Sequence, residues 1–191
     1  MSKNKILKLF DDSVSVLSQS KILEKSIQQV IDKIILCYEN GNKLIVFGNG
    51  GSAADSQHFV AEFVGRFLKE RESLPAIALT TDTSILTALG NDYSFDTIFS
   101  RQCESIVQKN DIVIGISTSG NSINVINGLE IAKNRGGVTV GLLGSGGGKL
   151  GKLVDMSIII PSNSTPRIQE SQRVIMHIIC ELVEEHFSNK K

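Results

Sequence analysis

One stretch of this chain combines a strand, a glycine-rich turn and the start of a helix: Leu44-Ile-Val-Phe-Gly-Asn-Gly-Gly-Ser-Ala-Ala-Asp-Ser-Gln-His-Phe-Val-Ala-Glu-Phe-Val-Gly-Arg66. The apolar run Leu44–Phe47 is typical of a parallel strand that is buried on both faces. The glycines within Gly48–Gly51 allow a sharp turn and a close approach of the backbone to a ligand, because glycine has no Cβ. Ser52 or Asp55 can cap the following helix, whose free N–H groups are suited to bind an anion.

The chain beyond this stretch continues to alternate strands and helices. Predicted strands lie at 44–47, 75–79, 112–116, 138–143 and 156–160. Predicted helices lie at 53–68, 95–108, 122–135 and about 167–187, with short turns near 84–89 and 148–153. Alternating β and α units predict an α/β fold in which a five-stranded parallel sheet lies between two layers of helices, a three-layer αβα sandwich.

Residues 3–40 have a different pattern, which predicts an N-terminal helical pair. Apolar side chains recur there at helical spacing: Ile6, Leu7, Phe10, Val14 and Leu17, then Ile27, Val30, Ile31, Ile34 and Ile35. One small domain is not expected to cover the first of these apolar faces, so this pair should pack partly against another subunit. We therefore predict one domain over 1–191, with a helical extension at 1–40 and an αβα core at 41–191.

Composition excludes several classes of protein. Lys plus Arg and Asp plus Glu both total 20, so no basic field attracts nucleic acid or an anionic membrane. No run approaches the roughly 20 apolar residues of a membrane helix, and Asp11 and Asp12 interrupt the N-terminus before the core of a signal peptide forms. Cys37, Cys103 and Cys180 are far apart, which favours buried thiols over zinc knuckles or disulfides. We expect a cytoplasmic protein without nucleic-acid or membrane partners.

A second loop, Ser117-Thr-Ser-Gly-Asn-Ser122, also follows a buried strand and precedes a helix. Its hydroxyl groups and the N–H groups of a helix start suit a phosphate monoester without help from Lys or Arg. In doubly wound sheets such loops gather at the carboxyl ends of the strands, where ligands bind. A simple Ser/Thr capping turn is the alternative, but the matching loop at Gly48–Ser52 favours a phosphate site.

Two rival motifs predict nucleotide binding less well. Gly48-x-Gly50-x-x-Ala53 fits the dinucleotide fingerprint but lacks the acidic residue about 20 positions on. The nearest candidate, Asp82, lies 29 positions past Ala53. Gly144-Ser-Gly-Gly-Gly-Lys149 superficially matches a P-loop, but its spacing is short and Leu150 replaces the metal-binding Ser or Thr. No nucleotide cofactor is expected.

The candidates for chemistry lie on two predicted helices. His58 and Glu62 share one helix face, about 6 Å apart along the axis, and beside a phosphate loop they suit a metal ligand and a general base better than a surface ion pair. His177 lies in an apolar helical stretch, where a hydrogen-bonded core histidine is the usual case. Gln169 and Arg173 fall near the same face, and ion pairing explains Arg173 equally well.

Four segments together resemble the sugar isomerase (SIS) fold: Phe47-Gly-Asn-Gly-Gly-Ser52, Gly90-Asn-Asp92, Gly115-Ile-Ser-Thr-Ser-Gly-Asn-Ser122 and Arg167-Ile-Gln-Glu170. The serine-rich segment alone marks only the superfamily. Its occurrence together with His58-x-x-x-Glu62 and His177 is specific, and the chain resembles the phosphoheptose isomerases over essentially its whole length.

The resemblance implies an aldose–ketose isomerase that converts sedoheptulose 7-phosphate to D-glycero-D-manno-heptose 7-phosphate, the entry step to ADP-heptose for lipopolysaccharide core. It also implies a cytoplasmic homotetramer with active sites at subunit interfaces and a zinc ion in each subunit. Carried over by position, the substrate-binding residues are Asn49, Gly50, Gly51, Ser52, Glu62, Asn91, Asp92, Ser117, Thr118, Ser119, Ser122 and Gln169. The implied zinc ligands are His58, Glu62, Gln169 and His177, of which Glu62 and His177 also form the catalytic acid–base pair.

The implied chemistry suits these residue types. Converting a ketose to an aldose moves a proton between C1 and C2 through an enediol and needs no redox cofactor. A carboxylate in a site closed to water can be the base, an imidazole can shuttle the second proton, and a metal can polarise the carbonyl. On one continuous helix Gln169 and His177 lie about 12 Å apart along the axis. They share a metal only if Gln169 precedes the helix or two subunits contribute, and we favour the second arrangement.

This chain departs from the family at two positions, and two other function classes stay open. Many relatives have His where this chain has Gln172 and Asp where it has Pro166, so no role is carried over to either. One alternative is a non-catalytic SIS protein that binds a partner such as a bacterial replication initiator, but such relatives tend to lose the acidic residue at Glu62. Another phosphosugar isomerase or a sugar-phosphate sensor is the second, although no DNA-binding segment occurs here.

Overall fold

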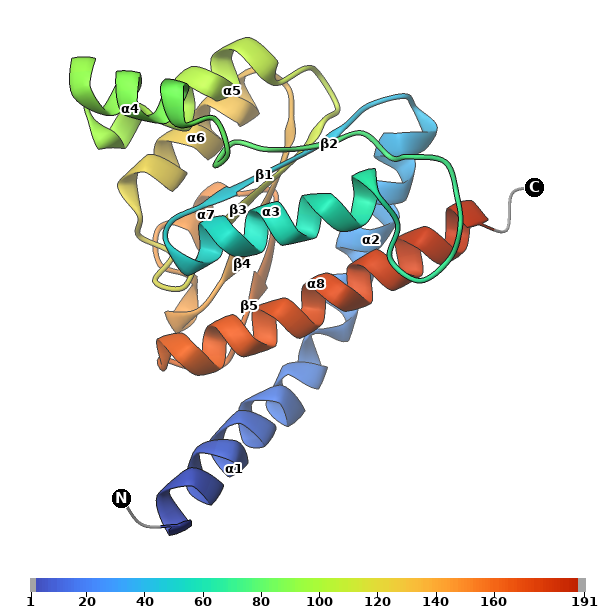
Figure 1. Cartoon of the computed structure of the whole chain (residues 1–191), viewed down its shortest axis with the longest axis vertical. Helices are drawn as coiled ribbons and strands as arrows, with labels where there is room; N and C mark the ends of the chain where they lie inside the picture. The colour runs from blue at the N-terminus through green and yellow to red at the C-terminus, as the bar shows by residue number, and fades with distance from the viewer. Residues whose placement is uncertain (1–2, 189–191) are drawn as a thin grey trace.

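Five strands form a single parallel sheet in the order β2-β1-β3-β4-β5 (Figure 1). The computed structural model describes residues 3–188, so residues 1–2 and 189–191 of the predicted domain lie outside it. The strands are β1 (Leu44–Gly48), β2 (Ala76–Ala78), β3 (Ile112–Ser117), β4 (Val138–Leu143) and β5 (Met156–Ile159). The α-helices are α1 (Lys3–Gln19), α2 (Glu24–Glu39), α3 (Gly51–Val64), α4 (Thr83–Asp92), α5 (Ser100–Ile106), α6 (Ile123–Asn134), α7 (Leu150–Leu153) and α8 (Thr165–Ser188). Short 3₁₀ helices are η1 (Ser20–Leu23), η2 (Phe95–Thr97) and η3 (Ser145–Gly147). None of the helices in this described part of the chain is long and apolar enough to cross a membrane.

Hydrophobic side chains cover both faces of the sheet, because successive residues of a strand point to opposite sides. From β1, Leu44 and Val46 join a first buried cluster with residues of α2, α3 and α8. Ile45 and Phe47 of the same strand join a second cluster with residues of α5, α6 and α7. Helices therefore lie on both faces (Figure 1), and the predicted three-layer αβα sandwich is confirmed.

The predicted N-terminal helical pair is also confirmed, as α1 and α2 joined by η1. α2 packs in the first cluster, where Val30, Ile31 and Ile34 are at most 2% exposed. α1 instead projects away from the sheet (Figure 1), and its Phe10 and Val14 are 67% and 60% exposed. A single protomer therefore leaves the apolar face of α1 uncovered.

Four elements differ from the prediction. The helix expected at 95–108 is divided into η2 and α5, and the turn expected near 148–153 contains the short helix α7. α3 ends at Val64, four residues earlier than expected, because the side chains of Arg71 and Glu184 bind the backbone at its end and in the following loop. A helix, α4, replaces the turn expected near 84–89. Asp82 starts α4 by accepting a hydrogen bond from a backbone N–H of its first turn. No residue of α4 is buried, although Leu86 and Leu89 pack against the second cluster. The apolar pattern of this short helix is therefore a weak signal in the sequence.

The cysteines lie in α2, α5 and α8, and all three are buried with free thiols, as predicted. Removal from water raises the pKa of Cys37 to about 11 and the pKa of Cys103 to about 12. Both thiols are therefore protonated at neutral pH and act as small hydrophobic side chains.

Substitution of two helical glycines by alanine is expected to have opposite effects. At Gly128 in α6, an added Cβ would lie 2.8 Å from Cζ of Phe47 and 3.0 Å from Cβ of Phe99. Gly128→Ala should destabilise the fold by about 1–3 kcal/mol, because these stacked rings are fully buried. At Gly90 in α4 an added Cβ meets nothing within 4 Å, so Gly90→Ala should leave stability unchanged or raise it by up to about 1 kcal/mol. Urea unfolding followed by circular dichroism measures both, and equal effects would contradict the packing described.

Candidate active site

The candidate site lies where the strand order reverses. β1 continues to β2 on one side of the sheet, β3 continues to β4 on the other, and β1 and β3 pair directly. The loops after β1 and β3 therefore open side by side at the carboxyl ends of the strands, where ligands bind in such sheets. These are the two loops, Gly48–Ser52 and Ser117–Ser122, that the sequence singled out.

The first loop turns at Gly50, whose φ of 58° is a backbone conformation that residues with side chains rarely adopt. Gly50 occupies the N-cap position of α3, so the predicted cap by Ser52 or Asp55 is wrong. The reason is that α3 already begins at Gly51 and contains both residues. Ser52 is buried, and its N–H donates to the carbonyl oxygen of Asn49 at 3.0 Å.

The side chain of Asn49 connects this loop to α6. Its carboxamide and that of Asn124 exchange two hydrogen bonds, at 2.8 and 2.9 Å. Asn124 is 2% exposed, whereas Asn49 is half-buried. The side chain of Asn49 is thus engaged with protein, and the loop presents mainly backbone groups to a ligand. No pattern in the sequence singled out Asn124.

Hydroxyl groups order the second loop. Ser117 Oγ and Ser122 Oγ lie 3.0 Å apart, and the N–H of Gly120 donates to Ser117 Oγ at 3.2 Å. The N–H of Asn121 donates to Ser119 Oγ at 3.1 Å. Ser122 stands at the N-cap position of α6 without a side-chain cap bond, so N–H groups of the first turn remain available to an anion.

A third loop, Gly144–Lys149, supports the serine-rich loop. Gly120 packs so closely on it that a Cβ would lie 2.0 Å from the carbonyl oxygen of Gly147, and φ at Gly120 is 65°. The N–H of Lys149 also donates to Asn121 Oδ1 at 3.0 Å. The glycine run that superficially matches a P-loop thus has a structural role. Its glycines are the feature of the sequence that could have indicated this close packing.

Helices α3 and α8 bring three of the predicted residues together in one protomer. His58 Nε2 and Glu62 Oε1 lie 2.9 Å apart across one turn of α3. The ring of His177, on α8, lies 5.3 Å from the ring of His58 between centroids, nearly perpendicular at 78°. His177 therefore contacts His58, one of the two residues of the pair, and is only half-buried. We refer to His58, Glu62 and His177 as the acid–base cluster.

A cleft of about 550 Å³ adjoins this cluster. It is lined by Gly51, Ala54, Asp55, Pro166, Gln169, Glu170, Arg173, Val174 and His177. α8 begins at Thr165, so Gln169 lies within its first turns and does not precede the helix. Gln169 Nε2 lies 2.9 Å from the position that a Cβ of Gly51 would take, so the cleft reaches the first loop. A contribution from a second subunit stays a prediction.

An ion pair connects the two helices along this cleft. Arg173 donates to Asp55 Oδ1 through Nε at 3.2 Å and through Nη2. The Asp55 side chain is 3% exposed, whereas that of Arg173 is 55% exposed. Ion pairing, one of the two explanations considered for Arg173, is therefore observed, and it fixes α3 against α8 beside the acid–base cluster.

Within residues 3–188, no group of three or more His, Cys, Asp or Glu side chains stands in a metal-binding arrangement. The acid–base cluster nevertheless consists of two imidazoles and a carboxylate, which are ligand types that zinc takes in proteins. The carboxamide of Gln169 lines the adjoining cleft. The donor set therefore fits zinc in its chemistry.

Asn91 and Asp92 lie away from this cleft. They end α4, both are exposed, and Asn91 Nδ2 donates to Asp92 Oδ1 at 2.9 Å. Leu86 and Leu89 of α4 pack against the second cluster, on the face of the sheet opposite α8 (Figure 1). A substrate-binding role for Asn91 and Asp92 stays a prediction.

The chain is similar to known proteins over most of its length. Residues 9–144 match the family model of the SIS domain. A phosphoheptose isomerase of Citrifermentans bemidjiense is 58% identical over 162 residues, 85% of this chain and 84% of that protein. The structure of a phosphoheptose isomerase from Neisseria gonorrhoeae matches with a TM-score of 0.91 at 38% identity, over 96% of this chain and 98% of that chain. One from Francisella tularensis matches with a TM-score of 0.93 at 34% identity, over 97% and 100%. The chain belongs to the SIS-domain family and, within it, to the phosphoheptose isomerases.

Proposed function

We propose that this chain converts sedoheptulose 7-phosphate to D-glycero-D-manno-heptose 7-phosphate in the cytoplasm, for the synthesis of ADP-heptose. The observation that carries the proposal is the acid–base cluster of His58, Glu62 and His177, which adjoins a cleft that reaches Gly51. Membership of the phosphoheptose isomerases supports the same aldose–ketose isomerisation.

The phosphate group of the substrate fits the paired loops after β1 and β3. The N-terminus of α6 offers backbone N–H groups and the positive end of a helix dipole to a phosphate dianion. The second loop adds the hydroxyls of Thr118, which is half-buried, and Ser119, which is exposed. These groups orient the phosphate and so fix which end of the sugar enters the cleft.

The acid–base cluster supplies the proton transfers. Glu62 removes a proton from C1 of the ketose and returns it to C2 of the enediol, while His177 moves a proton between the oxygens on C1 and C2. The substrate gains and loses no electrons, and each side chain returns to its starting state. His58, 2.9 Å from Glu62, orients the carboxylate.

We further propose that His58, Glu62, Gln169 and His177 hold a zinc ion. The support is the chemistry of these donors. His58, Glu62 and His177 meet in one protomer, and Gln169, about 12 Å from His177 along α8, would come from a second subunit. When bound, zinc would polarise the carbonyl group that is interconverted.

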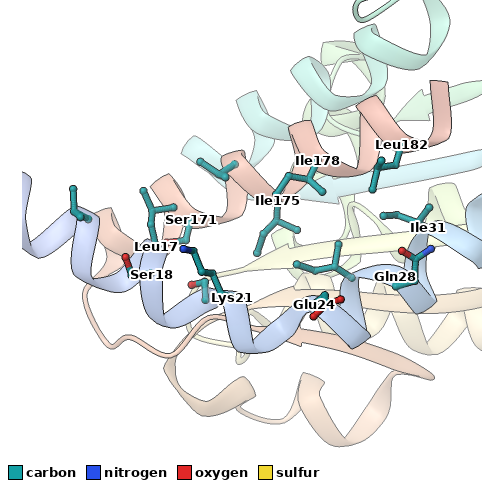
Figure 2. A pocket seen from close by; sticks show the side chains of 14 residues that line it. Leu17, Ser18, Lys21, Glu24, Gln28, Ile31, Ser171, Ile175, Ile178 and Leu182 are labelled. Carbon is teal, nitrogen blue, oxygen red and sulfur yellow. The ribbon is translucent and has the colours of Figure 1, made fainter. Parts of the chain in front are cut away.

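We also propose that protomers assemble into a tetramer, with a second copy of the chain in an apolar groove between the N-terminal helices and α8. The groove measures about 600 Å³. Figure 2 shows Leu17 and Ile31 on one wall and Ile175, Ile178 and Leu182 on the other. Ile178 and Leu182 are each 39% exposed, and the uncovered face of α1 is a matching apolar surface.

Glu62→Gln tests the proposed base, because it removes the carboxylate and keeps the shape of the side chain. We expect turnover to fall by about 10²–10⁴-fold, with an unchanged unfolding midpoint. Proton NMR in D₂O with sedoheptulose 7-phosphate follows the aldose anomeric signals and deuterium at C2. Glu104→Gln, at an exposed carboxylate that pairs with Arg101, is the matched control and should keep wild-type turnover. Near wild-type turnover in Glu62→Gln would exclude Glu62 as the base.

The wild-type spectrum separates the competing functions. Aldose signals with deuterium at C2 would support an enediol that exchanges its proton with solvent. Aldose without deuterium would keep the isomerase but indicate shielded proton transfer or a hydride shift. No conversion, even after zinc is restored, would overturn the proposed function and favour a partner-binding SIS protein.

Removal of metal tests the zinc site. Dialysis against a chelator should lower both bound zinc and turnover, and added zinc should restore both. Gln169→Ala should lower the zinc content measured by mass spectrometry while circular dichroism stays unchanged. Gln108→Ala, at an exposed position outside the cleft, is the control. A full zinc complement in Gln169→Ala would contradict its role as a ligand.

A charge in the groove tests the assembly. Ile178→Asp should shift the tetramer to smaller species in light scattering coupled to size-exclusion chromatography, because an unpaired carboxylate is costly to bury. Ile178→Val keeps an apolar side chain at the same position and should remain tetrameric. An unchanged mass for Ile178→Asp would place the interface elsewhere.

A further inference from the structure

A buried ion pair holds the loop that connects α3 to β2. Arg71 lies in this loop and Glu184 lies in α8, with 3.5 Å between Nε of the former and Oε1 of the latter. Both side chains are 2% exposed, and neither lines the cleft. Any effect of this pair on the reaction must therefore act through the groups that it holds.

Glu184 binds the backbone of the loop. Its carboxylate accepts hydrogen bonds from three successive N–H groups, those of Phe67 at 2.7 Å, Leu68 at 2.5 Å and Lys69 at 2.7 Å. Burial opposes the charge, but these donors and Arg71 outweigh it and hold the pKa of Glu184 below its usual value. The carboxylate is ionised at neutral pH and fixes the position of Phe67.

Arg71 binds the end of α3. Its Nη2 donates to the carbonyl oxygen of Glu62 at 2.6 Å, and its Nη1 donates to those of Phe63 at 2.8 Å and Gly65 at 3.2 Å. These carbonyls belong to the last turn of the helix and its cap, which lack intrahelical partners and attract a cation. The guanidinium group of Arg71 thus fixes the backbone of Glu62 and leaves its carboxylate free for other contacts.

The same loop also contacts His177 of the acid–base cluster. The ring of Phe67 lies 5.5 Å from the ring of His177 between centroids, tilted by 37°. Because Glu184 holds the N–H of Phe67, it sets where this ring lies against the imidazole. One network therefore reaches both Glu62 and His177, through the backbone of the first and the ring neighbour of the second.

We propose that Arg71 and Glu184 are positioning residues for the isomerisation, which set Glu62 and His177 in the geometry for proton transfer through the helix end and through Phe67. The proposal rests on the roles proposed above for Glu62 and His177. It assigns the network a function beyond folding. The phosphate loops after β1 and β3 lie outside this network. Loss of the network should therefore affect the proton-transfer step more than substrate binding.

Phe67→Leu tests the proposal with little risk to folding, because Phe67 is only partly buried and its backbone bond to Glu184 is kept. We expect kcat to fall about ten- to a hundredfold, since small misplacements of reacting groups have effects of this size, while KM stays within about twofold. Phe67→Tyr keeps a ring against His177 and should retain kcat. Assays use the full chain with saturating zinc, and thermal melts confirm that each variant is folded at the assay temperature.

Glu184→Gln tests the ion pair itself, with Glu185→Gln as the matched control. Glu185 is the next residue of α8 and contacts Lys69 of the same loop at 3.1 Å, but its side chain is 53% exposed. The fraction of Glu184→Gln that folds should show the same loss of kcat at constant KM, whereas Glu185→Gln should match the wild type. If Glu184→Gln does not fold, Phe67→Leu against Phe67→Tyr decides.

The outcomes separate this inference from the proposed function. A folded Phe67→Leu with wild-type kcat, or a loss of kcat shared equally by Phe67→Tyr, would overturn the positioning role. A rise in KM at constant kcat would overturn it as well, because the network would then act on binding. Absence of turnover in the wild type would instead mean that the proposed function has failed.

Discussion

The direct pairing of β1 with β3 is the constraint on which the rest of the site depends. Gly48 and Ile116 are partners in the parallel register, so the two strands end beside each other. Val46 and Ile114, two residues earlier, are at most 2% exposed, and the strands are covered on both faces. The loops at their ends therefore cannot separate without breaking the centre of the sheet. Their relative position is fixed before any ligand binds.

The proposed chemistry is placed by a different device, the crossing of two helices. α3 begins in the first loop at Gly51 and carries His58 about 10 Å further along its axis, where α8 brings His177. This span suits an open-chain sugar phosphate that is held at one end and reacts at the other. In the proposed reaction, the sheet edge would hold the anion and the helix crossing would carry the groups that transfer protons.

Patterns along the chain predicted the strands, both loops and the sandwich, because each depends on residues close in sequence. The partners of those residues could not be predicted in the same way. Asn49 meets Asn124 across 75 positions and Asp55 meets Arg173 across 118, without any local signal. His58, Glu62 and His177 were predicted from spacing and family resemblance, and the fold brings them together. Asn91 and Asp92 end α4, whose Leu86 and Leu89 pack on the opposite face of the sheet. The sequence does not reveal whether a neighbouring subunit brings such residues to the site. The single-domain organisation stays a prediction.

The reciprocal hydrogen bonds of Asn49 and Asn124 constrain how such a chain can evolve. The Nδ2 group of each side chain donates to the Oδ1 atom of the other. An Asp at either position would replace one of the two donors by an acceptor oxygen beside the buried Asn124, where an unmade hydrogen bond is costly. A single replacement at either position therefore loses a hydrogen bond, so we expect the two residues to change together. The contact thus couples the two strand–loop–helix units, although 75 positions separate them in the sequence.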